Sequence, residues 1–151
     1  MYSIEEKKQL VTNFWNGFNM YCSHQPFLKG RRRIWMLHKT KVPHVQLKFD
    51  PGRDGIQIIL ELLHRNENER LEVYELLERC KTILEDGFSN GLIWDFAYMR
   101  ENGQEVCRIY TEKKGLDIHR QRDWEEMYEF MAANMLQMEK NFLEVRELIT
   151  K

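Results

Sequence analysis

The sequence predicts a single α+β domain over residues 1–151, with a five-stranded, mostly antiparallel sheet and helices packed on one face. Its length of 151 residues is close to that of one ordinary domain. Segments with helical apolar spacing and segments with alternating apolar residues follow one another in the order α-β-β-β-α-β-β-α. Hydrophobic residues at 42% can build a core, and only three prolines and eight glycines argue against disordered or fibrous classes.

The first helix is expected from Ile4 to Cys22. Ser3 and Glu6 have the spacing of a capping box, which satisfies the free N–H groups of a helix start. Apolar side chains then recur at helical intervals, at Ile4, Val11, Phe14, Trp15, Phe18 and Cys22. Pro26 and Gly30 indicate that residues 23–30 form a loop.

Three strands should follow as an antiparallel meander over residues 34–40, 44–50 and 56–63. The first is rich in strand formers, and the second alternates cleanly, with Val45, Leu47 and Phe49 on one face. The third is apolar on both faces, which is typical of a central strand. The turn residues from Asp50 to Gly55 join the last two strands.

A second helix and a second pair of strands come next. Asn66 and Glu69 again have capping-box spacing, and the helical period runs to Leu84, with Gly87 placed to end the helix. Residues 92–99 and 105–111 flank Asn102-Gly103, a pair that favours a tight hairpin turn.

The last helix should start at an Asp123 cap and run about 26 residues to Ile149. Its apolar residues alternate in steps of three and four, at Trp124, Tyr128, Met131, Met135, Met138, Phe142, Val145 and Ile149. One interpretation is a long helix packed across the sheet and against the first helix. The other is a seam between two copies of the chain in a homodimer.

Positive charge is concentrated in the first third of the sequence. Residues 7–49 contain no Asp or Glu and nine of the 23 Lys and Arg, although the whole chain has a net charge of −1. Basic side chains neutralise phosphates, and an aromatic ring can stack on an unpaired base. The candidate nucleic-acid-binding residues are Arg31, Arg32, Arg33, Trp35, Lys39, Lys41, His44 and Lys48. The alternative is a solvated edge whose charges are met by the acidic helices.

Several common chemistries lack their sequence signatures. The three cysteines, Cys22, Cys80 and Cys107, have no CxxC spacing and are expected to be reduced and mostly buried. Neither a metal-ligand motif nor a GxSxG elbow nor a Gly-rich phosphate loop occurs, so no metal and no cofactor is expected. No apolar run approaches membrane-spanning length, so we expect a cytoplasmic protein without a membrane partner.

A metal-dependent nuclease of the restriction-endonuclease-like class is one catalytic alternative. Such enzymes hold Mg²⁺ with an Asp on one strand and a Glu-x-Lys on the next. Asp50 or Asp54 followed by Glu61, with His64 nearby, are weak candidates. Leu63 occupies the position where that pattern needs Lys, and Glu61 could instead be a buried carboxylate paired with Arg108.

Taken together, several short patterns resemble a bacterial family of small domains of unknown function. They cover almost the whole chain: Phe14-Trp15 with Phe18, Trp35 with Lys39-Thr40 and His44, Ile58-Ile59-Leu60-Glu61 with His64, Arg108-Ile109-Tyr110, and Asp123-Trp124. In longer relatives of that family a similar domain follows a restriction-endonuclease-like nuclease domain. The resemblance therefore implies a role beside nucleic-acid processing, and it assigns no catalytic residue.

The function predicted from the sequence is a non-catalytic binding or accessory module, associated with nucleic acid through the basic residues between Arg31 and Lys48. The nuclease and a homodimeric protein-interaction module that uses the last helix remain as alternatives. The sequence thus predicts nucleic acid, a second copy or another protein as partners.

Overall fold

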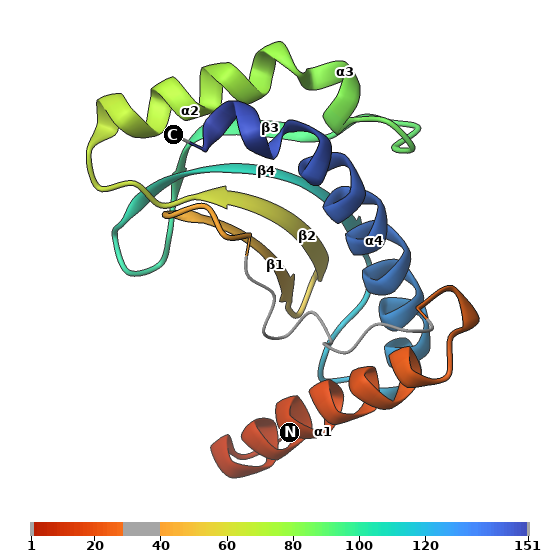
Figure 1. Cartoon of the computed structure of the whole chain (residues 1–151). Helices are drawn as coiled ribbons and strands as arrows, with labels where there is room; N and C mark the ends of the chain where they lie inside the picture. The colour runs from red at the N-terminus through yellow and green to blue at the C-terminus, as the bar shows by residue number, and fades with distance from the viewer. Residues whose placement is uncertain (1, 29–39, 151) are drawn as a thin grey trace.

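A computed structural model describes residues 2–28 and 40–150 of the chain (Figure 1). One short 3₁₀ helix lies at Pro26–Leu28, after the first α-helix. Another lies at Gln121–Asp123, directly before the last α-helix. The main elements are α1 (Ile4–Ser23), β1 (Val45–Pro51), β2 (Gly55–Leu62), α2 (Glu67–Arg79), α3 (Lys81–Leu84), β3 (Ile93–Met99), β4 (Glu105–Lys114) and α4 (Trp124–Ile149).

The described strands form one antiparallel sheet in the order β1-β2-β4-β3. The α+β class is therefore confirmed, but the expected five strands are corrected to four within the described residues. The expected strand at 34–40 lies outside those residues, apart from Thr40. Two hairpins, β1-β2 and β3-β4, lie side by side because β4 pairs with β2.

The helices cover one face of the sheet, as the alternation predicted. Leu47, Leu60 and Ile109 are neighbours across β1, β2 and β4, and all three are buried on the face that carries the helices. In Figure 1 the strands bend, and α2 and α4 lie along the outer side of the bend. The opposite face, which we call the open face, carries Glu61 opposite Arg108.

All three expected helix starts are confirmed, but only the first two have the expected capping hydrogen bond. The side chain of Ser3 accepts a hydrogen bond from the N–H of Glu6, and that of Asn66 accepts one from the N–H of Glu69. Asp123 is the N-cap residue of α4, but its side chain makes no capping hydrogen bond, because its carboxylate accepts instead from the N–H of Asp117 at 2.9 Å and from Arg120 at 2.8 Å. The Asp117 N–H, as the main cause, holds the pKa of this carboxyl below its ordinary value.

The helix expected as far as Leu84 is divided at Cys80 into α2 and the short α3. Side chains of Glu85 and of Asn141 hold the loop between α3 and β3 in place. Glu85 accepts from the N–H of Leu92 and from the indole N–H of Trp94, while Asn141 of α4 donates to the carbonyl of Leu84 at 3.0 Å. These contacts connect the start of β3 to the last helix.

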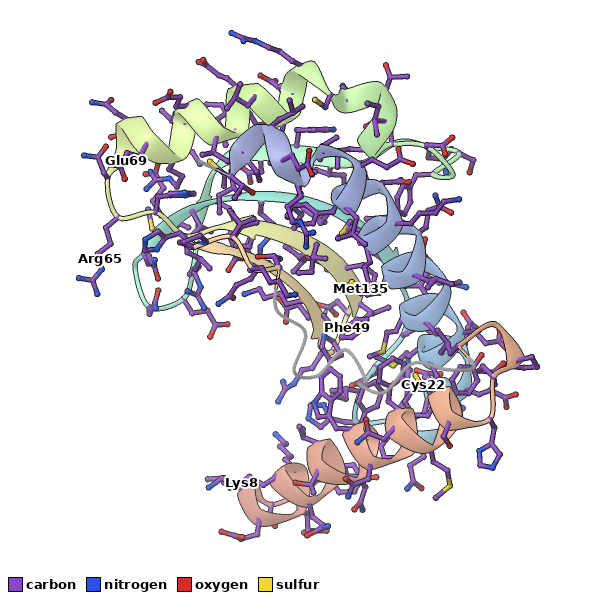
Figure 2. The ribbon with its side chains drawn as sticks, viewed as in Figure 1. Lys8, Cys22, Phe49, Arg65, Glu69 and Met135 are labelled. Atoms are coloured by element: carbon purple, nitrogen blue, oxygen red, sulfur yellow. The ribbon has the colours of Figure 1, made fainter. Side chains whose placement is uncertain are left out.

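Aromatic side chains fasten α1 to α4. The buried Phe14 ring packs edge-on against Trp124, and the Tyr128 hydroxyl donates to the Phe14 carbonyl at 2.7 Å. A Cβ atom at Gly17 would meet that hydroxyl, so the close approach of the two helices needs glycine there. Figure 2 shows Cys22 at the end of α1 near α4 and Lys8 at the far end.

Packing of α4 across the sheet and against α1 is confirmed. The side chains of the expected seam lie within the chain's own core. Seven of them are buried, namely Tyr128, Met131, Met135, Met138, Phe142, Val145 and Ile149, and Trp124 is partly buried. These residues are not available to a second copy, so a homodimer through α4 would need its outer face.

Candidate nucleic-acid interface

Three charged side chains form a compact group at the centre of the open face. Glu61 is fully buried; its Oε2 accepts from Nε of Arg108 at 2.9 Å and from Nη2 at 2.7 Å. Its Oε1 lies 2.8 Å from Nζ of Lys48. We call Lys48, Glu61 and Arg108 the ion cluster. Two cations face this buried carboxylate, and Asp50 beside Arg108 supplies a second negative charge.

Further contacts hold the Arg108 guanidinium in place. Nη1 donates to Oε1 of Gln57 at 3.0 Å and lies 3.4 Å from Oδ2 of Asp50. The Tyr98 ring covers the guanidinium, whose carbon is 3.8 Å from the ring centroid. Stacking and paired hydrogen bonds suit the planar guanidinium, so Arg108 is a rigid part of the face.

A shallow pocket of about 380 Å³ lies beside the ion cluster. Its lining comes from β1, from β4 and from the end of β3 with the turn after it, and includes Lys48, Asp50, Tyr98, Arg100, Asn102 and Arg108. We call this the open-face pocket. A shift of register between Asp95 and Tyr98 interrupts β3 just before the residues that line the pocket. Such bulges re-aim the side chains that follow them.

Three of the predicted nucleic-acid-binding residues fall in the described part of the chain. Lys41 and His44 are exposed just before β1, and Lys48 belongs to the ion cluster. Lys41 and His44 both have a φ of 65°, an uncommon value for residues with a Cβ. The other five, Arg31, Arg32, Arg33, Trp35 and Lys39, lie outside the described residues.

A histidine pair lies where β1 begins and β2 ends. The rings of His44 and the buried His64 are 5.2 Å apart between centroids, and Nη1 of Arg70 donates to the His64 carbonyl at 2.8 Å. Burial above all, and then His44, lowers the pKa of His64. His64 is therefore expected to be neutral at pH 7, and it lies apart from the ion cluster at the end of β2.

This pKa shift predicts that acid destabilises the fold through His64. The unfolded chain takes up a proton near pH 6.5, whereas folded His64 takes it up only at lower pH. The free energy of unfolding should hence be unaffected by His64 above about pH 7 and should fall as the pH drops below 6.5. Urea denaturation of the wild type and of His64→Gln between pH 7.5 and 5 measures this, and a wild type with the same pH slope as the variant would contradict it.

The nuclease candidates do not assemble as that mechanism needs. Glu61 already faces two cations, and Asp50 contacts Arg108, so a divalent ion would compete with Lys48 and Arg108. Within residues 2–28 and 40–150, no group of three His, Cys, Asp or Glu side chains could hold a metal ion. Pairing of Glu61 with Arg108 is confirmed.

The cysteine prediction is confirmed. Cys22 and Cys107 are buried, Cys80 is partly buried, and all three are free thiols. Burial above all raises the pKa of Cys107 to about 11, so this thiol stays protonated and unreactive at neutral pH. Among the described helices, none is long and apolar enough to span a membrane.

Tyr98, Arg100 and Asn102 line the pocket but were not among the residues predicted from the sequence. The hairpin around Asn102-Gly103 was predicted, and alternation along 105–111 could have placed Arg108 opposite the core. No sequence pattern predicts which way the end of the β3-β4 hairpin bends, because the bend depends on the interrupted pairing of β3 with β4.

Fold and site together define a small α+β protein with a curved antiparallel sheet, helices on one face and a charged pocket on the other. A family model described as Domain of unknown function (DUF4268) matches residues 10–146. The chain belongs to the DUF4268 family. No curated protein and no solved structure matches it.

Proposed function

We propose that this chain is a non-catalytic module that binds single-stranded nucleic acid along the open face of its sheet. The observation that supports this most directly is that Lys48, Arg100 and Arg108 line one pocket together with Tyr98, on a face that none of the described helices covers. Cations neutralise phosphates and aromatic rings stack on unpaired bases, which is how open antiparallel sheets take single strands.

The basic residues before β1 extend this surface. Lys41 and His44 are exposed where β1 begins, and Lys48 lies farther along the same strand. A single-stranded nucleic acid that contacted Lys41 would reach the ion cluster by following β1. Arg31, Arg32 and Arg33, which precede this segment in the sequence, would add to the positive potential.

Acidic residues at the pocket limit the expected affinity. The side chain of Asp50 is half exposed, and Glu101 also lines the pocket. We therefore expect weak, salt-sensitive binding, with a Kd on the order of 10⁻⁴ to 10⁻⁶ M at physiological salt, as for other sequence-independent contacts. An accessory role beside enzymes that process nucleic acid is consistent with such affinity.

Replacing Lys41 with Glu should weaken binding of a labelled single-stranded oligonucleotide and lower its salt dependence. Loss of one phosphate contact reduces the slope of log K against log salt by about 0.7. Fluorescence anisotropy at several salt concentrations measures both quantities. Lys41 is exposed, so the variant should fold normally.

Lys140→Glu is the matched control, because Lys140 is an exposed lysine on α4, which covers the opposite face of the sheet. It makes the same change of charge and should leave the salt slope unchanged. Equal effects of the two variants would show that only net charge matters. Absence of binding at low salt, or an affinity that ignores salt, would overturn the proposed function.

A further inference from the structure

The open-face pocket offers hydrogen-bond donors that are already held in position. Arg108 is fixed by Glu61 and Gln57, and Nη1 of Arg100 donates to Oε1 of Gln104 at 2.9 Å. The side-chain Oδ1 of Asn102 accepts from the backbone N–H of Gln104 at 3.0 Å, which orients the side-chain amide of Asn102. Groups fixed in this way lose little entropy when a ligand binds.

Asp50 supplies the complementary acceptor. Its carboxylate is 52% exposed, and its contact with Arg108 is long, at 3.4 Å. An ionised carboxylate can accept about four hydrogen bonds, so Asp50 keeps most of this capacity for a ligand. A ligand that fits must present adjacent donors to Asp50 and an acceptor to the neighbouring Arg108 or Asn102.

Guanine has this arrangement on one edge. Its N1–H and N2–H₂ groups are adjacent donors that one carboxylate can receive together, and its O6 acceptor stands beside them. Adenine and cytosine each have an acceptor next to their amino group, and uracil and thymine have a single N–H between two carbonyls. A carboxylate in the position of Asp50 would therefore distinguish guanine from the other bases by the two adjacent donors of guanine.

We propose that the open-face pocket binds one guanine base of the bound strand, with Asp50 as the residue that determines base specificity. This inference rests on the proposed function and adds a base preference to it. A pocket of about 380 Å³ is within the usual size of small-molecule sites. Tyr98 supplies aromatic surface in its wall, and the backbone phosphates lie toward Lys48 and Arg100.

The test compares short labelled oligouridine strands that carry one central guanosine, inosine, adenosine or uridine. Inosine lacks only the N2 amino group, so it isolates the second hydrogen bond to Asp50. We expect guanosine to bind about tenfold more tightly than uridine, as expected for one good bidentate pair, and inosine to bind with intermediate affinity.

Asp50→Asn gives two effects of opposite sign. Removal of a negative charge should strengthen binding of the strand without guanosine, whereas the preference for guanosine should disappear. Asp54→Asn is the matched control, because Asp54 is exposed in the β1-β2 turn, outside the pocket lining. This variant should keep the full preference for guanosine.

The two proposals fail in different ways. Salt-sensitive binding of all four strands with equal affinity would overturn the guanine site and leave the proposed function intact. Absence of binding to any strand at low salt would overturn both. A guanosine preference that survives in Asp50→Asn would also overturn the assignment of this pocket.

Discussion

Replacing Arg108 with Ala is expected to lower the free energy of unfolding by about 3–5 kcal/mol, the usual cost of leaving a buried charge without its partner. Glu61 is fully buried and takes two hydrogen bonds from Arg108. After the substitution only Lys48 would remain beside its carboxylate. Urea denaturation at pH 7 measures the loss.

A double variant separates the cost of the orphaned charge from the loss of packing. Glu61→Leu together with Arg108→Met replaces the pair by apolar side chains of similar size, which is often close to neutral for a buried ion pair. We expect the double variant to recover most of the stability lost in Arg108→Ala. If Arg108→Ala had the same urea midpoint of unfolding as the wild type, Glu61 would not be buried as a charged group.

Phe14→Ala should also destabilise the fold by about 3–5 kcal/mol, the range for removal of a buried aromatic ring. Phe14 is fully buried between α1 and α4 and contacts the rings of Trp15, Trp124 and Tyr128. The cavity would open where α1 attaches to the rest of the molecule. Denaturation curves followed by tryptophan fluorescence would report it, since two of these partners are tryptophans.

Ile4→Ala provides the control on the same helix. Ile4 is 74% exposed in the first turn of α1, so its truncation should change the free energy of unfolding by no more than about 0.5 kcal/mol. If the two variants were equally stable, α1 would not be held to α4 by its aromatic residues.

Features that depend on a few neighbouring residues could be predicted. The caps at Ser3 and Asn66 were predicted correctly because donor and acceptor lie three residues apart. Asp123 precedes α4 as predicted, but it makes no capping hydrogen bond, because Asp117 and Arg120 occupy the same carboxylate. The competing Asp117 N–H depends on the conformation of the loop before α4, which capping-box spacing does not describe.

The pairing of Glu61 with Arg108 lies between these cases. The two residues are 47 positions apart in the sequence. A carboxylate within an apolar strand requires a charged partner, however, and an arginine within another predicted strand can supply it. The addition of Lys48 to the same carboxylate could not be anticipated in this way, because it depends on the register between β1 and β2.

Periodicity in the sequence determined the α+β class, the length of α4 and the buried face of β1, because these follow from the spacing of apolar residues along one segment. The tertiary structure alone decided that β4 lies beside β2, that α4 buries its apolar seam within the chain, and that Asp50, Tyr98 and Arg108 line one pocket. These outcomes depend on contacts between distant segments, whose partners are chosen by the packing of the whole sheet and its helices.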